Sequence, residues 1–193
     1  MSRSIVILLG HPDRDSLCGA MAKRYRDAAQ AAGHGVRLFA LGEAEFDPVL
    51  RHGYRQIQPL EPDLQEIMAA IAECNHLVLI YPTWWGGMPA LLKGFFDRAF
   101  LPGVAFRYRK ESVWWDRLLS GRSARVITTL DTPPWYYRWV YRMPGYQQIR
   151  RTILAFCGIN PVRISGFGPV RSTSLQVREG WLRKVAALGR AAA

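Results

Sequence analysis

The chain has 193 residues, which is long enough for one domain that buries about 70% of its unfolded surface without disulfides or metals. Its hydrophobic fraction of 49% is that of an ordinary globular protein, and no apolar run approaches the roughly 20 residues of a membrane span. The net charge of +11 is uneven, because residues 1–102 carry 10 Lys/Arg and 11 Asp/Glu whereas residues 103–193 carry 16 and 4.

The basic second half is compatible with nucleic acid, an acidic membrane surface or a phosphate-bearing ligand as a partner. Its basic residues are scattered, mostly arginine, and form no recognised nucleic-acid motif, so we expect no nucleic-acid binding. The three cysteines and four histidines show no metal-ligand spacing, so no metal site is expected. His11 and Pro12 follow the first apolar run in place of a cleavage site, which favours a strand over a signal peptide. A cytoplasmic location with reduced thiols is the default expectation.

The first two predicted strands, residues 4–9 (SIVILL) and 36–41 (VRLFAL), flank an amphipathic helix from Leu17 to about Gly33. A strand, a helix and a parallel strand in so short a span form a right-handed βαβ unit. Residues 43–59 follow without a clear period. We expect them to form an ordered excursion, of the kind that often covers a site or a subunit contact.

The loop at residues 10–16 lies between a strand and a helix, where free helix N–H groups favour an anion. Ser16 is placed to cap the helix and to offer a hydroxyl to a phosphate, and His11 is placed to donate from a ring nitrogen. Asp13 and Asp15 would then have to point away from the phosphate, unless one is only a cap. The loop alone is equally compatible with a plain capped helix.

A helix at residues 64–71 leads into a third buried strand at residues 77–80 (LVLI). Pro82 ends this strand, because proline cannot continue a central sheet ladder. Pro89 suits the first turn of the following helix, in which apolar residues recur at helical spacing as far as Ala99.

Two large aromatic rings, Trp84 and Trp85, lie in the loop between this strand and helix, followed by Gly86 and Gly87, which let the backbone turn tightly. In an open parallel sheet, ligands bind at the carboxyl ends of the strands. The two tryptophans would form a platform for a flat ring there, although core packing explains them equally well.

The remaining elements are, in chain order, a polar and aromatic loop at residues 107–116, a strand at 124–130 (ARVITTL), a helix at 149–157, a strand at 161–167 (PVRISGF) and a helix at 177–188. The segment at residues 131–146 (DTPPWYYRWVYRMPGY) is too irregular to be one element. Thr128 and Thr129 end the fourth strand, at the same sheet edge as His11 and Trp84.

Five strands alternating with helices predict one doubly wound α/β domain over residues 1–193. Gly10 is followed by HPDRDS, so the glycine fingerprint of a dinucleotide-binding domain is absent, as is a nucleotide-triphosphatase phosphate loop. The expected strand order is therefore 2-1-3-4-5, whose switch point lies between the first and third strands. The loops at residues 11–18 and 82–87 would meet at that crevice.

The stretches GHPDRDSLCGAM, FDPVL and YPTWWGGMPALLKGFFDRAFLPGVAF, with the two threonines, resemble the NAD(P)H-dependent quinone reductase family of flavodoxin-like proteins. The similarity runs from about residue 4 to residue 130 and is most specific around WWGGMPALLKGFFDR. It implies a flavodoxin-like fold, a tightly but non-covalently bound FMN or FAD, and a homodimer with active sites at the subunit interface. The chain is short and has no clear extra segment for an adenosine half, which favours FMN.

The residues that match the family's flavin loops are His11, Ser16, Leu17 and Cys18; Pro82, Thr83, Trp84, Trp85 and Gly86; and Thr128 and Thr129. The family usually continues with two glycines, whereas this chain has Leu130 and Asp131, which we expect to approach the flavin differently. Family members commonly place a Tyr and a His near the flavin N1/O2 edge. This chain has no histidine after His76, so Tyr136, Tyr137 or Arg138 would have to substitute as catalytic residues.

The resemblance implies hydride transfer in two steps through one pocket, from NAD(P)H to the flavin and then to a quinone or similar flat acceptor. A first alternative is a flavin-binding regulatory subunit with little turnover that docks on a partner such as a membrane transporter. The replaced glycines and the bulky run at residues 133–141 motivate it. A second alternative, a nucleic-acid binder, would show salt-sensitive DNA association. The choice between NADH and NADPH, and the acceptor, stay open.

Overall fold

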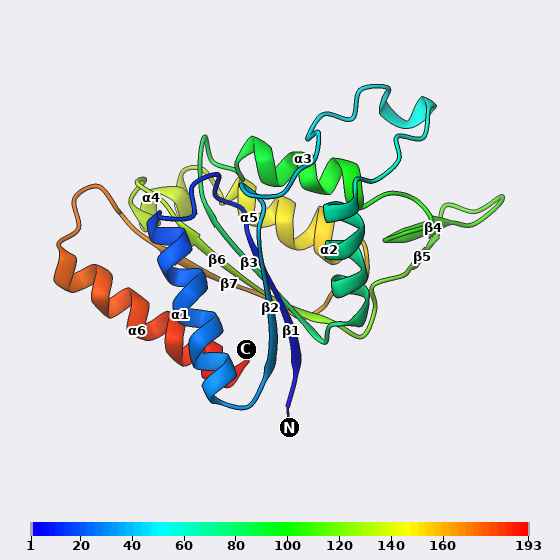
Figure 1. Cartoon of the computed structure of the whole chain (residues 1–193). Helices are drawn as coiled ribbons and strands as arrows, with labels where there is room; N and C mark the ends of the chain where they lie inside the picture. Colours follow the sequence, from blue (N-terminus) through cyan, green and yellow to red (C-terminus); the bar gives the residue numbers. More distant parts are fainter. Residues whose placement is uncertain (1, 193) are drawn as a thin grey trace.

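A five-stranded parallel sheet forms the centre of the structure, a computed structural model that describes residues 2–192 (Figure 1). The strand order is β2-β1-β3-β6-β7, which is 2-1-3-4-5 when these five strands are counted in chain order, as predicted. The strands are β1 Ser4–Leu9, β2 Gly35–Ala40, β3 His76–Pro82, β6 Ser123–Thr129 and β7 Val162–Phe167.

Helices cover both faces of this sheet, as the doubly wound prediction requires (Figure 1). The helices α1 Leu17–Ala31 and α6 Leu175–Ala191 pack on one face, and α2 Pro62–Glu73, α3 Ala90–Ala99 and the π-helix η2 Gln148–Leu154 pack on the other. Successive side chains of a strand point to opposite faces, so the central strands must be apolar throughout. In β3, for example, Leu77 and Leu79 enter one core and Val78 and Ile80 enter the other.

Two stretches of the second half differ from the sequence-based expectation. The predicted loop at residues 107–116 is an antiparallel hairpin of β4 Phe106–Tyr108 and β5 Trp115–Arg117. The sequence did not reveal it, because strands of three residues are too short to show a two-residue period. Its Trp115 ring stacks on Phe156 at a centroid distance of 4.3 Å. The irregular segment after β6 contains two short helices, α4 Pro134–Trp139 and α5 Pro144–Gln147.

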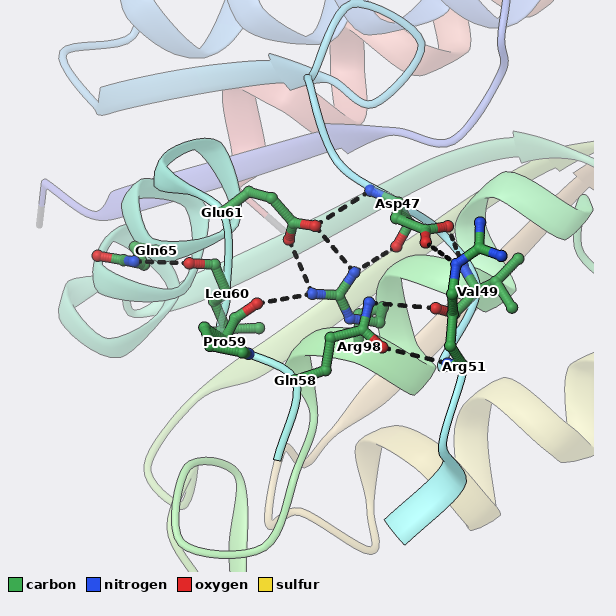
Figure 2. Close-up of polar contacts among 9 residues, drawn as sticks. All are labelled: Asp47, Val49, Arg51, Gln58, Pro59, Leu60, Glu61, Gln65 and Arg98. Carbon is green, nitrogen blue, oxygen red and sulfur yellow. Dashed lines mark hydrogen bonds and ion pairs between the residues drawn. The ribbon is translucent and has the colours of Figure 1, made fainter. Parts of the chain in front are cut away.

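The excursion between β2 and α2, which contains the 3-10 turn η1 Gly53–Arg55, is ordered by one buried cation (Figure 2). The Arg98 guanidinium is fully buried and donates to both carboxylate oxygens of Glu61, at 3.0 and 2.9 Å, and to the backbone carbonyls of Asp47 and Pro59. The expectation of an ordered segment is therefore confirmed. Within residues 2–192, no helix is long and apolar enough to cross a membrane.

Candidate functional site

The loop after β1 is held by its own polar side chains. Ser16 caps α1 by accepting from Gly19 N at 3.2 Å, and its hydroxyl donates to the Asp13 carbonyl at 2.8 Å. The Asp13 carboxylate accepts from Asp15 N at 2.8 Å, so it is turned onto the loop's own backbone. His11 Nδ1 accepts from Asp13 N at 2.9 Å, which places the ring hydrogen of the neutral imidazole on Nε2.

This arrangement leaves an anion cradle at the start of α1. The first amides of a helix have no acceptor within the helix, and here these belong to Leu17 and Cys18. Burial raises the pKa of the Cys18 thiol to about 11, against the weaker opposing effect of its contact with Thr129, so the thiol is neutral at pH 7. A neutral thiol adds no negative charge to a loop that would receive a phosphate.

The loop after β3 makes a tight turn that displays two indole rings. Trp84 and Gly87 exchange two backbone hydrogen bonds of 3.0 Å, and the two residues between them, Trp85 and Gly86, have φ values of +51° and +78°. A left-handed conformation costs a bulky residue roughly 1–2 kcal/mol, and the Trp85 side chain is fully exposed. Strain of this kind persists only where the surroundings impose it.

Tyr137, which follows Gly86 by 51 positions in the sequence, holds this turn in place by a direct hydrogen bond. Its side chain is buried, and its hydroxyl donates to the Gly86 carbonyl at 2.9 Å and accepts from Gly145 N at 3.1 Å. Gly145 N also donates to the Gly86 carbonyl at 2.9 Å. The Gly86 carbonyl is thus fixed by two hydrogen bonds, one from Tyr137 in α4 and one from Gly145 in α5.

The two loops meet as predicted. The Trp84 ring lies edge-on to the His11 ring, with a centroid distance of 5.7 Å and an interplanar angle of 70°. Behind them, Thr83 Oγ1 and Thr128 Oγ1 are 2.7 Å apart, and the Cys18 thiol lies 3.4 Å from Thr129 Oγ1. Both threonines that end β6 are buried, so their hydroxyls join the loops to one another.

Leu130 and Asp131, which stand where the resembling family usually has two glycines, lie in different environments. Leu130 is buried, and its backbone continues the pairing with β7, donating to the Phe167 carbonyl and accepting from Val170 N. Its backbone N–H and carbonyl are therefore both occupied, and the approach of Leu130 to a flavin stays a prediction. Asp131 lies at the surface, and its carboxylate accepts from Arg171 N at 2.7 Å.

A cavity of about 690 Å³ opens where these loops converge, within the range of small-molecule pockets. Its lining residues are Thr83, Trp84, Trp85, Gly86, Asp131, Thr132, Tyr141 and Pro144. We call this cavity the Trp groove. Five of the eight belong to the predicted set, and the amide cradle of α1 adjoins it through the His11–Trp84 contact. Exposed aromatic rings, a donor cradle and a cavity of this size fit a flat cofactor that carries a phosphate.

Of the three residues predicted to be catalytic, the structure places none on the lining of the Trp groove. Tyr137 is buried with its hydroxyl committed to two backbone groups, and Arg138 lies over the Trp139 ring at 5.1 Å. Tyr136 packs edge-on against Tyr141 at 5.0 Å, and it is Tyr141 that lines the groove. The sequence carried no signal that distinguishes the four tyrosines of this segment. No group of three or more metal-ligating side chains occurs within residues 2–192.

Comparison with known proteins gives one family. Residues 3–187 match the profile of a family described by its flavodoxin-like fold. An uncharacterized NAD(P)H oxidoreductase of Haemophilus influenzae is 28% identical over 188 residues, which are 94% of this chain and 91% of that protein. NAD(P)H dehydrogenase (quinone) 1 of Cavia porcellus is 28% identical over 127 residues, which are 55% of this chain and 46% of that protein.

Solved structures also match this chain over nearly its whole length. The crystal structure of Smu.1420 from Streptococcus mutans has a TM-score of 0.83 and 30% identity, covering 97% of this chain and 98% of that one. The NAD(P)H:quinone oxidoreductase from Methanothermobacter marburgensis has a TM-score of 0.81 at 24% identity, covering 98% and 96%. The chain therefore belongs to the flavodoxin-like fold family, and its relatives include proteins named as quinone reductases, as the resemblance implied.

Proposed function

We propose that the protein is a flavin-dependent NAD(P)H oxidoreductase that reduces quinones or similar flat acceptors by two electrons. The observation that carries the proposal is the His11–Trp84 contact, which joins an amide cradle for a phosphate to an aromatic groove for a flat ring. The names of the relatives support the same activity class.

The phosphate end of the cofactor would lie on α1. Leu17 and Cys18 offer backbone N–H groups, and His11 offers Nε2–H. The Ser16 hydroxyl would first have to turn away from the Asp13 carbonyl to donate to the phosphate. We propose FMN because these groups serve one terminal phosphate. A structure of an FMN-dependent NADH-azoreductase from Bacillus anthracis, which holds FMN, shares the fold with a TM-score of 0.74 at 17% identity.

The ring end would lie in the Trp groove. A bound flavin supplies the hydride chemistry, accepting two electrons from NAD(P)H and delivering them to the acceptor. The chain's own part is to hold the reactants flat against Trp84 and Trp85 and to limit water. Thr132 and Tyr141 offer hydroxyls, and Tyr141 takes the place that sequence reasoning gave to Tyr136, Tyr137 or Arg138.

We further propose that the protein is a homodimer. A separate apolar groove of about 360 Å³ runs between the excursion and the segment after α3, and Tyr54, Ile57 and Val104 are exposed on it. The β4–β5 hairpin projects on the same side of the molecule as this excursion (Figure 1). Together they form the face on which we place the second copy.

The test is the visible absorption spectrum of protein desalted after incubation with FMN, before and after anaerobic NADPH. We expect a retained flavin band that bleaches, followed by reoxidation on addition of a quinone. Ser16→Ala and Trp84→Ala should both weaken flavin retention, whereas Ser2→Ala and Trp114→Ala, distant exposed residues of the same types, should not.

Each other outcome has a definite meaning. Unchanged flavin affinity in both Ser16→Ala and Trp84→Ala removes the site assignment. A retained band that neither NADPH nor NADH bleaches, together with quinone turnover no faster than that of free flavin, favours a regulatory flavin-binding subunit instead. The bulky Leu130–Asp131 pair in place of two glycines is the feature that would then explain it.

A further inference from the structure

The short helix α4 displays large apolar side chains to solvent. Trp135 and Trp139 are 63% and 71% exposed, and Val140 is 52% exposed. The two tryptophans are four positions apart, so they lie on the same side of the helix. Isolated exposed apolar residues are ordinary, but two adjacent indoles on one helix side form a patch.

This patch is held rigidly. Tyr137, on the opposite side of α4, is buried with a doubly hydrogen-bonded hydroxyl, and its ring packs against Tyr146 at 5.0 Å. Because this anchor fixes the helix, the exposure of Trp135 and Trp139 follows from the packing of the fold. One side of α4 is thus firmly packed, whereas its other side has no cover among the described residues.

The sequence that carries the patch is rich in arginine. No Asp or Glu occurs between residues 132 and 178, a stretch with seven arginines. Two of these are nearest to the patch in the sequence: Arg138 lies over the Trp139 ring at 5.1 Å, and Arg142 is exposed. The nearest acidic residue in the sequence is Asp131, whose carboxylate accepts from Arg171 N. We call Trp135, Arg138, Trp139, Val140 and Arg142 the α4 face.

We propose that the α4 face docks the protein on an anionic lipid bilayer. Indole rings prefer the boundary between lipid and water, and arginines beside them are attracted by anionic headgroups. With about 250 Å² per ring, the two indoles expose on the order of 300 Å², well below the roughly 800 Å² per partner of a stable protein interface. A patch this small, with two exposed arginines, fits an anionic surface better than a second copy of a chain whose net charge is +11.

The position of the α4 face in the molecule is consistent with this occupant. The α4 helix and the β4–β5 hairpin project on opposite sides of the sheet (Figure 1). Lipid on one side therefore leaves the other side open to the second copy proposed above. Tyr141 lies one residue beyond Val140 and lines the Trp groove, so docking would bring the groove mouth to the headgroup region. The benefit for an acceptor dissolved in lipid rests on the proposed function, whereas the docking itself does not.

The test is co-sedimentation of the flavin-free protein with phosphatidylcholine vesicles, with and without phosphatidylglycerol. We expect binding only to the anionic vesicles, and weaker binding as salt rises. Arg138→Gln with Arg142→Gln should weaken binding about fivefold per arginine, which corresponds to about 1 kcal/mol each. Trp135→Ser with Trp139→Ser should abolish it.

Matched controls lie on the hairpin. Trp114→Ser removes another exposed indole, and Arg107→Gln with Lys110→Gln removes two other exposed charges, so both should bind like the wild type. Thermal unfolding checks that each variant is folded, and the single variants Trp135→Ser and Trp139→Ser serve if the double variant is not.

Three results would overturn the proposal. The first is no binding of the wild type to anionic vesicles. The second is an equal loss in the hairpin controls, which would indicate attraction by net charge alone. The third is a change of mass by light scattering in the α4 variants with unchanged vesicle binding, which would assign the face to a second copy. Because no flavin or NAD(P)H is present, failure of this test is distinct from failure of the proposed function.

Discussion

Replacing Arg98 with methionine should detach the excursion between β2 and α2 from the core. The Arg98 side chain is fully buried, whereas that of Glu61 is 28% exposed. Burial is the largest single effect on Glu61 and would raise its pKa. The hydrogen bonds and charge of Arg98, together with hydrogen bonds from the backbone N–H groups of Glu61 and Asp47, outweigh burial and hold the pKa below its usual value. Removing one partner of a buried ion pair costs about 3–5 kcal/mol. Since water can reach part of Glu61, we expect the lower end, about 3 kcal/mol.

Urea unfolding measures this difference, and calorimetry should show a Tm lowered by roughly 6–12 °C, since a chain of this size loses about 2–4 °C per kcal/mol. Arg51→Met is the control, because Arg51 pairs with Asp47 at the surface, where such pairs contribute only about 0–1 kcal/mol. Adding Glu61→Gln to Arg98→Met should restore part of the loss by removing the unpaired charge.

Limited trypsin digestion gives a second readout, because Arg51 and Arg55 lie in the excursion and should be cut faster in Arg98→Met. The gap in stability between wild type and Arg98→Met should narrow as the pH falls below about 4.5, where Glu61 becomes protonated in the unfolded chain. Equal stability of Arg98→Met and Arg51→Met would refute the assignment of Arg98 as the anchor of this segment.

Three further predictions concern the site and the far end of the sheet. Tyr137→Phe should cost about 1–2 kcal/mol by urea unfolding, because the Gly86 carbonyl loses a buried donor; a cost no larger than that of the exposed control Tyr54→Phe would contradict this. Trp85→Gly should raise stability by about 1 kcal/mol through relief of the left-handed strain and should weaken FMN retention, so a less stable variant that retains FMN normally would count against both roles. Burial, and then nearby arginines, lower the pKa of His76 to about 4. The unfolded chain binds a proton near pH 6.5 and the folded one does not, so wild-type stability should fall between pH 6.5 and 4 by up to about 3 kcal/mol from this group. His76→Gln should remove that part of the pH dependence, and parallel pH profiles for the two proteins would argue against it.

Most of the architecture was predictable because local pattern and global fold agree. Runs such as residues 4–9 and 77–80 are apolar on both sides, which only a strand between two helical layers can satisfy. The predicted strand order places β1 beside β3, so that their carboxyl ends are neighbours. The meeting of His11 with Trp84, 73 positions apart in the sequence, was therefore predictable.

The segment after β6 was not predictable, because its conformation depends on partners elsewhere in the chain. Nothing local distinguishes Tyr137 from Tyr141, yet one is buried against the Gly86 carbonyl and the other lines the groove. Leu130 faces the core because β7 pairs with its backbone. Periodicity encodes which side of an element is buried, and it therefore determined the sheet and its crevice. Only the tertiary structure decided which side chains of an aperiodic segment face the crevice, since that choice rests on single hydrogen bonds between distant residues.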